Sequence, residues 1–311
     1  MRYLRKKFAA FPVYEWLEIG LMLCLAGGFL DAYTFVTRGG VFANAQTGNM
    51  ILLAIGLAGG DGLRALRYLV PILFFFAGVF LSELLLRLGK KTRGDFRGHG
   101  FVLAAEIAVL VVVGFLPADV PDMLVNALVS FAAAVQFDNF RRLEGKPFAT
   151  AFCTGNLRSA TEHVFHGVVE KQKGAIRTAG KYFAVILAFI GGVTAGYFAS
   201  RALGGYAALI AAGVLLLVLA AILCGHAVRM RRIRVRRLAQ GEIPAAQALI
   251  WESFTRFVAP MFEAEGAENF RRFLYDLPLS DGYEWYGVFA GGMIKGAMVA
   301  RRDGTHIAAF F

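Results

Sequence analysis

The sequence predicts an all-α, polytopic membrane domain of six transmembrane helices, followed by a small α+β segment. Composition is the first observation: of 311 residues, 58% are hydrophobic and 18% charged, against roughly 45–50% and 25% in an average soluble domain. The second observation is six apolar stretches that reach or approach the length needed to cross a hydrocarbon core of ~30 Å. Only three cysteines occur, so a disulfide scaffold is excluded, as are disorder and a collagen-like chain.

The six apolar stretches are spread over the first 228 residues. Buried helices of a soluble protein are not expected, because so many apolar segments would leave too little polar surface. The first stretch is also too long for the hydrophobic region of a signal peptide. The predicted transmembrane helices are Leu17–Thr37, Tyr68–Leu88, Phe101–Leu116, Met123–Phe140, Tyr182–Ser200 and Tyr206–Val228.

Lysine and arginine are concentrated in alternate connections between these helices. The N-terminus, the second-to-third loop, the region after the fourth helix and the region after the sixth are rich in both residues. Cytoplasmic loops of membrane proteins carry this excess of positive charge. We therefore expect both termini in the cytoplasm.

A motif is repeated in the two halves of the domain. Asp31 is followed sixteen residues later by Thr47-Gly48-Asn49, and Asp138 is followed sixteen residues later by Thr154-Gly155-Asn156. The offset is the same in both cases, 138 − 31 = 154 − 47 = 107. Gly78 and Gly192 also correspond, after a seven-residue insertion. The pattern predicts two structural repeats, at about 16–116 and 122–228.

The charge-based topology places the two Thr-Gly-Asn motifs on opposite sides of the membrane. Each half holds three crossings, so the halves are predicted to be inverted relative to each other. The apolar runs that follow the motifs, 50–58 and 157–165, are too short to span and are predicted to be re-entrant half-helices. The alternative is that both runs cross fully, which gives eight helices and parallel halves.

Polar residues within the apolar helices mark the candidate site. Asp31 lies in an apolar helix, where a carboxylate is costly and therefore a default functional residue; the alternative is that it only caps the first Thr-Gly-Asn turn. We expect Asn49 and Asn156 to bond freed backbone groups and to lie close together. The predicted substrate-binding residues are Asp31, Thr47, Gly48, Asn49, Gln136, Asp138, Asn139, Thr154, Gly155 and Asn156.

No catalytic or metal-ligating residue is predicted. Glu162, His166 and Glu170 recur at helical spacing, but three such residues near a loop are a poor metal signature. Glu106 is expected near the cytoplasmic end of the third helix. The Gly192–Gly196 segment has two small residues four apart, a pattern typical of close helix packing.

The composition changes after a basic linker at 229–232. The remaining residues, 233–311, alternate in the order strand, helix, helix and three strands, which predicts an α+β domain in the cytoplasm. The arginine-rich segment Arg229–Arg237 is expected to contact anionic lipid rather than nucleic acid.

Two resemblances follow from particular segments. Residues from about Trp16 to Val228 resemble bacterial six-helix membrane proteins of the YoaK type, through Gly27–Ala32, Gly39–Asn49, Phe140–Arg142 and Thr154–Glu162. This resemblance implies a multi-pass protein of the bacterial plasma (inner) membrane.

The C-terminal segment resembles the first half of a GNAT-type N-acetyltransferase domain. The residues that carry the resemblance are Ile233–Arg236, the helix Ile243–Val258, and Gly292–Gly296 leading to His306 and Ile307. The sequence stops at Phe311, before the loop that this family uses for acetyl-CoA. No cofactor is therefore expected, and acetyl-CoA only if the domain is completed beyond residue 311.

The leading functional hypothesis is transport or permeation of a small polar or anionic solute through a central polar site. A membrane-tethered N-acetyltransferase and a non-transporting membrane scaffold are the alternatives. The expected partners are membrane lipids, the solute and possible further copies of the same chain.

Overall fold

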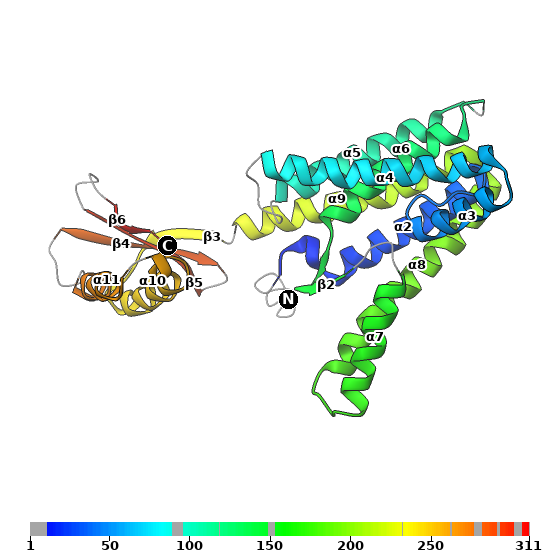
Figure 1. Ribbon diagram of the computed structural model, residues 1–311. Helices are drawn as coiled ribbons and strands as arrows, with labels where there is room; N and C mark the ends of the chain where they lie inside the picture. Colours follow the sequence, from blue (N-terminus) through cyan, green and yellow to red (C-terminus); the bar gives the residue numbers. More distant parts are fainter. Residues whose placement is uncertain are drawn as a thin grey trace. The chain divides into compact units, whose positions relative to one another are not determined.

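A computed structural model describes residues 11–88, 96–117, 119–148, 153–231, 233–261, 263–276, 282–290, 293–301 and 307–310. Figure 1 shows these parts of the chain. They divide into two compact units, one formed by Phe11–His226 and one that contains Ala227–Phe311. Each unit has its own packed interior.

Where the structure describes it, the first unit consists of helices and one two-stranded hairpin. Its long helices follow the predicted apolar stretches, and a shorter helix begins at each Thr-Gly-Asn motif. The elements are η1 (Val13–Glu15), α2 (Leu17–Thr37), α3 (Gln46–Ala58), α4 (Gly62–Leu88), α5 (Phe96–Phe115), α6 (Asp122–Asn139), β1 (Arg142–Leu143), β2 (Lys146–Pro147), α7 (Cys153–Val168), α8 (Ala175–Leu203), η2 (Gly204–Ala207) and α9 (Ala208–Arg231).

Among the described residues, four helical stretches are long and apolar enough to cross a membrane. They are Leu17–Thr37, Gly62–Leu85, Gly98–Phe115 and Ala175–Val228. The last stretch is 54 residues long and contains α8, η2 and most of α9. Helix α6 does not reach this hydropathy, because Asn126, Gln136 and Asp138 interrupt its apolar sequence. The structure therefore supports a multi-pass helical domain with four such stretches.

The helices pack in pairs that join the two halves of the sequence. Helix α2 packs along α8, and α4 packs along α6. Each short helix packs on the long helix that follows it, α3 on α4 and α7 on α8, and Figure 1 shows α7 against the first part of α8.

Glycines permit the closest helix contacts. A β-carbon added to Gly192 would lie 2.1 Å from the carbonyl oxygen of Leu25, and one added to Gly28 would lie 2.2 Å from that of Phe189. These distances are well inside van der Waals contact, so only glycine fits this α2–α8 crossing. The predicted packing role of the Gly192 segment is confirmed. A β-carbon on Gly78 would likewise lie 2.6 Å from the carbonyl oxygen of Phe131, where α4 meets α6.

The second unit is a four-stranded antiparallel sheet with two helices. The strand order is β3-β4-β5-β6, and Figure 1 shows α10 and α11 on one face of the sheet. The core contains Ile250 of α10, Leu274 of α11 and Trp285 of β4. The elements are β3 (Ile233–Arg237), η3 (Gln240–Glu242), α10 (Ile243–Phe257), η4 (Ala259–Met261), α11 (Ala264–Asp276), β4 (Tyr283–Ala290), β5 (Met293–Arg301) and β6 (Ile307–Phe310).

The predicted α+β order of the C-terminal segment is confirmed by these elements. The Gly292 and His306 positions of the predicted acetyltransferase resemblance lie outside the described residues. So does Arg232 in the predicted basic linker.

Candidate functional site

The Asp31 carboxylate is buried in α2 and holds the chain segment that precedes α3. Its Oδ1 atom accepts hydrogen bonds from the backbone nitrogen atoms of Asn44 and Ala45, at 2.6 and 3.4 Å. The side chain of Asn44 in turn donates to the carbonyl oxygen of Gly27 at 3.2 Å. Backbone N–H groups and the start of a helix both stabilise a buried anion. The alternative structural role of Asp31 is therefore present, although through Asn44 and Ala45 rather than the Thr-Gly-Asn residues.

The second oxygen of Asp31 is not used in this way. Among the described residues, Oδ2 is buried and has no hydrogen-bond partner. Asp31 also borders a cavity of about 230 Å³ between α2, the segment before α3 and α8. The aromatic residues that line this cavity are Phe35, Phe42, Phe189 and Tyr197.

Asn49 fixes the turn into α3. Its Oδ1 accepts from the backbone nitrogen of Phe42 at 3.0 Å, and its Nδ2 donates to the carbonyl oxygen of the same residue at 2.8 Å. Nδ2 also donates to Oε1 of Gln46 at 2.9 Å. Asn49 is fully buried, so the prediction that it bonds freed backbone groups is confirmed. Thr47 is exposed and takes no part in these described hydrogen bonds.

The second Thr-Gly-Asn motif occupies the first turn of α7. Asn156 is buried there, whereas Thr154 and Gly155 are exposed. Helix α7 packs along α8, and α8 in turn packs along α2.

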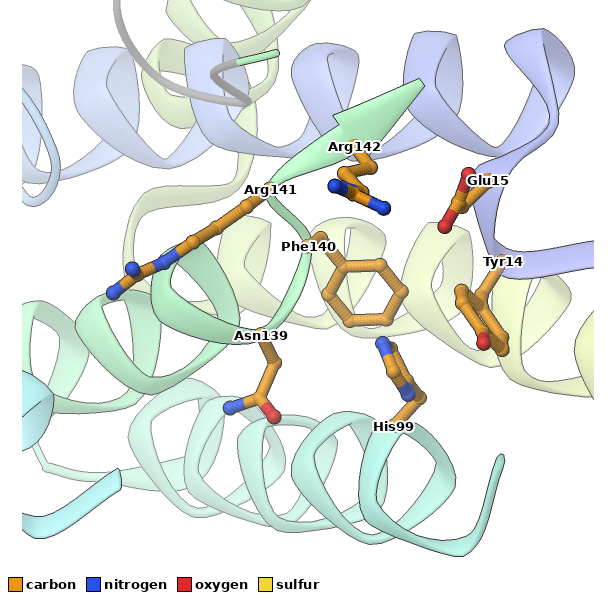
Figure 2. Close-up of a pocket in the computed structure, with 7 residues that line it drawn as sticks. All are labelled: Tyr14, Glu15, His99, Asn139, Phe140, Arg141 and Arg142. Atoms are coloured by element: carbon orange, nitrogen blue, oxygen red, sulfur yellow. The ribbon is translucent and has the colours of Figure 1, made fainter. Parts of the chain in front are cut away.

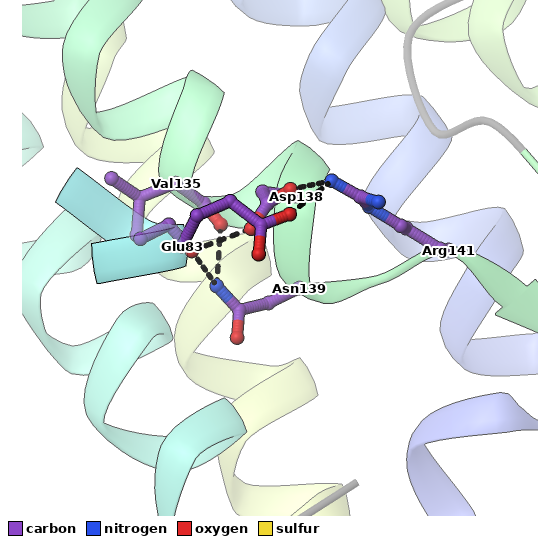
Figure 3. Close-up of polar contacts among 6 residues, drawn as sticks. Glu83, Val135, Asp138, Asn139 and Arg141 are labelled. Atoms are coloured by element: carbon purple, nitrogen blue, oxygen red, sulfur yellow. Dashed lines mark hydrogen bonds and ion pairs between the residues drawn. The ribbon is translucent and has the colours of Figure 1, made fainter. Parts of the chain in front are cut away.

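Asp138, the counterpart of Asp31, belongs to a different network (Figure 3). Its Oδ2 accepts from the Ser82 hydroxyl at 2.7 Å, and it forms an ion pair with Arg141. Asn139 donates to the same hydroxyl at 3.0 Å and to the carbonyl oxygen of Val135 at 2.8 Å. The network ties the end of α6 to α4, and Ser82 was not among the predicted site residues.

Gln136 faces a carboxylate in α5. With its amide nitrogen turned toward Glu106, it donates to Oε2 and Oε1 at 2.6 and 3.1 Å. The expectation that Glu106 lies near a helix end is wrong, because α5 begins at Phe96 rather than Phe101. Glu106 is buried at the middle of the helix, where a carboxylate requires a polar partner.

Apart from the second Thr-Gly-Asn motif in α7, the predicted residues with described polar contacts gather at three places. Asp31 and Asn49 hold the entrance to α3, Gln136 pairs with Glu106, and Asp138 joins Asn139 at the end of α6. No hydrogen bond or ion pair between described residues links Asp31 to either of the other places. Within the described part of the chain, no group of three His, Cys, Asp or Glu side chains is arranged to hold a metal ion.

A second cavity, of about 400 Å³, lies beside the end of α6 and the start of α5. Figure 2 shows Phe140 between His99 and Arg142 in this cavity. The His99 ring stacks on Tyr14 with centroids 4.0 Å apart and meets Phe140 edge-on at 4.9 Å. The other lining residues are Glu15, Asn139 and Arg141. No sequence pattern indicated this cavity, because its lining residues come from three separate parts of the chain, near positions 14, 99 and 140.

Comparison with known families accounts for the helical unit. A family profile described as "Protein of unknown function (DUF1275)" matches residues 19–222. The chain belongs to the DUF1275 family. It is also similar to the UPF0700 transmembrane protein YoaK of Bacillus subtilis (strain 168), with 25% identity over 178 residues, covering 55% of this chain and 79% of that protein.

These matches support a multi-pass membrane protein of the YoaK/DUF1275 type and, with the apolar helices, a membrane location. The DUF1275 match ends before the C-terminal unit begins. No solved structure matches the chain.

Proposed function

We propose that this DUF1275 protein crosses the bacterial inner membrane six times, as two inverted repeats with both termini in the cytoplasm. The helix pairs support the symmetry: exchanging α2 with α6 and α4 with α8 converts the α2–α8 pair into the α6–α4 pair. Gly78 and Gly192, aligned by sequence, each make the close contact within their pair. Two-fold related repeats require this exchange of equivalent contacts.

In this arrangement α3 and α7 are re-entrant segments. The two helices have 13 and 16 residues, fewer than the ~20 needed to span. Each is covered on one side by the following long helix. Asn49 supplies the hydrogen bonds that backbone outside a helix requires at membrane depth.

The function we infer for this domain is permeation or transport of a small polar solute. The observation that carries it is Asp31, a buried carboxylate at the edge of a cavity with one oxygen lacking a described partner. Structural capping alone uses only Oδ1. A negative charge at this position disfavours the anionic solutes that the sequence also suggested, and favours cationic or neutral ones.

The test is solute flux into liposomes that contain the purified protein. We expect a panel of small cationic, neutral and anionic metabolites to show uptake for at least one cationic or neutral solute, and Asp31→Asn to reduce it. Asp61→Asn is the control, because Asp61 is an exposed carboxylate that accepts from the backbone nitrogen of Arg64 at 2.9 Å. Absence of uptake for the whole panel in folded protein would favour the scaffold alternative.

The tethered N-acetyltransferase is the alternative for the C-terminal unit. Its support is the order β3, α10, α11, β4, β5 and β6, which is the order expected for the first half of such a domain. An acetyl-CoA loop encoded in frame after codon 311 would favour this alternative, and acetyl-CoA binding by the extended chain would test it.

We also propose contact between anionic lipid and the arginine-rich segment around β3. Arg236 and Arg237 already pair with Glu242 and Glu284 at 2.7 and 3.1 Å, so Arg234 is the described arginine best suited to such contact. Association of several copies remains a further proposal, testable by the mass of the detergent-solubilised protein.

A further inference from the structure

The described part of the helical unit buries three carboxyl side chains, which differ in their hydrogen-bond partners. They are Asp31, Glu106 and Asp138. Asp31 accepts from two backbone N–H groups, and Asp138 pairs with Arg141. The described partner of Glu106 is the neutral amide of Gln136. We propose that Glu106 is a proton-binding site, which exchanges its proton with water from the cavity of about 400 Å³ at the end of α6.

The surroundings of Glu106 favour the neutral acid. The charged form of a buried carboxyl is strongly disfavoured unless a cation or several hydrogen-bond donors compensate it. A carboxyl with a single neutral partner takes up a proton instead. In naming the proton as the ion coupled to solute passage, this proposal rests on the proposed function, whereas the proton site itself depends only on the contacts of Glu106.

The contact between Glu106 and Gln136 suits a protonated carboxyl. The amide atom that faces Glu106 lies 2.6 Å from Oε2 and 3.1 Å from Oε1. The shorter distance lies within the range of about 2.5–3.0 Å for O–H···O bonds and just below that of about 2.7–3.2 Å for N–H···O bonds. A neutral Glu106 fits either orientation of the amide, because its hydroxyl can donate to the amide oxygen and its carbonyl oxygen can accept from the amide nitrogen.

The described side chains packed around α5 supply no counter-charge. Helix α5 packs against α6 and η2, Tyr14 of η1 stacks on His99, and α9 brings Leu219 close to Gly100. None of the described titratable side chains on α5 and these elements forms a hydrogen bond or an ion pair with Glu106. These side chains are Tyr14, Glu15, His99, Asp122, Asp138, Tyr206, Cys224 and His226.

The cavity at the end of α6 gives the proton a route to water. On α5, His99 lies two helical turns before Glu106, and on α6, Asn139 lies about one turn after Gln136. Residues at these spacings share one face of a helix. His99 and Asn139 both line the cavity, and Figure 2 shows them beside Phe140. At ~1.5 Å rise per residue, the Glu106–Gln136 pair lies roughly 5–10 Å along the helices from these lining residues. Water that reaches this depth takes the proton from the carboxyl and returns it.

The test is infrared spectroscopy of the purified full chain in detergent. The difference between the unaltered protein and Glu106→Gln should contain a carboxylic-acid C=O band at neutral pH. This band should shift in deuterated water and disappear reversibly as the pH is raised. Glu162→Gln is the control and should produce no such difference, because Glu162 is an exposed carboxylate paired with Arg158 at 2.8 Å.

A second variant keeps the test valid if Glu106→Gln does not fold. Gln136→Leu retains the Glu106 carboxyl and removes its hydrogen bond, so the acid band should move to higher frequency. Absence of an acid band from the Glu106→Gln difference in folded protein would overturn the proposal. So would a band that neither shifts in deuterated water nor titrates, or one that Gln136→Leu leaves in place.

Flux into liposomes separates the proton site from transport. We expect a pH gradient to drive solute uptake by the unaltered protein and by Glu162→Gln, and not by Glu106→Gln. Uptake that is independent of the gradient in protein with the acid band would reject the coupling alone. Absence of all uptake in such protein would reject the proposed transport and retain the proton site.

Discussion

Buried amide and carboxylate groups hold the non-helical segment between α2 and α3. Asn49 binds both backbone groups of Phe42, and Asp31 binds the backbone of Asn44. Each side chain replaces a hydrogen bond that a helix would have supplied. These residues therefore have a structural role that does not depend on the proposed transport.

Replacement of Asn49 by leucine should destabilise the protein. Leucine has a similar size but cannot bond Phe42, and the unpaired backbone groups cost about 1–3 kcal/mol each. We expect a lower denaturant midpoint for Asn49→Leu in detergent. Met50→Leu, at the exposed neighbouring position, should leave the midpoint unchanged. Equal midpoints for both variants would contradict a structural role for Asn49.

The Asn156 counterpart should behave similarly if the two motifs are equivalent. Asn156 is buried in α7, and Leu157 beside it is exposed. We expect Asn156→Leu to lower the denaturant midpoint and Leu157→Met to have little effect. Stability retained in Asn156→Leu would indicate that the motifs play different roles.

In the C-terminal unit, the ion pair of Arg236 and Glu242 should lower the pKa measured when the Glu242 carboxyl is titrated. The guanidinium donates two bonds of 2.7 Å to the carboxylate, and Ala239 adds a backbone N–H bond. These bonds lower the pKa of Glu242 from 4.5 to about 2. Because the folded pKa is depressed, its contribution to stability is present above pH 4.5 and is lost as pH falls toward 2.

Arg236→Gln should therefore return the pKa of Glu242 toward 4.5, measured by carboxyl carbon chemical shifts in the full chain. Arg234→Gln removes an equal charge from the same strand and should leave the Glu242 titration unchanged. A titration unaffected by Arg236→Gln would show that the pair does not form in solution.

At the scale of helices, two adjacent glycines of α8 allow a test of the contact between α2 and α8, because only one of them lies in it. A β-carbon on Gly192 would meet the Leu25 carbonyl at 2.1 Å, whereas one on Gly191 would meet no heavy atom within 4 Å. Gly192→Ala should therefore separate the helices and lower the melting temperature. Gly191→Ala should keep or slightly raise it, since alanine favours helix more than glycine does. Equal melting temperatures would contradict the close crossing.

The helix boundaries also explain one wrong expectation. Residues 96–100 are polar or glycine-rich, so the hydropathy pattern places the beginning of the third apolar stretch at Phe101, although α5 begins at Phe96. With this extra turn Glu106 lies at mid-helix, and the packing of α5 against α6 brings it within reach of Gln136. Hydropathy detects the apolar part of a helix, whereas hydrogen bonding determines its ends.

For the whole molecule, the six-crossing topology makes a direct prediction. In a background without Cys24, Cys153 and Cys224, a cysteine at Asp119 should react with an impermeant thiol reagent added outside the cell. Cysteines at Gly98 and Gly145 should react only after the membrane is permeabilised. Labelling of positions 98 and 119 from the same side would overturn the six-crossing arrangement.

The sequence by itself determined the membrane class, the positions of the apolar helices, the two short helices at the Thr-Gly-Asn motifs and the order of elements in the C-terminal unit. These features depend on composition and on residues near one another in the chain. Tertiary structure alone decided that Asp138 bonds Ser82, which is 56 residues away, and that aromatic residues of α2 and α8 meet beside Asp31. Such contacts depend on how helices pack. The hydrophobic effect that drives this packing is non-directional, so a single sequence does not specify which helix faces meet.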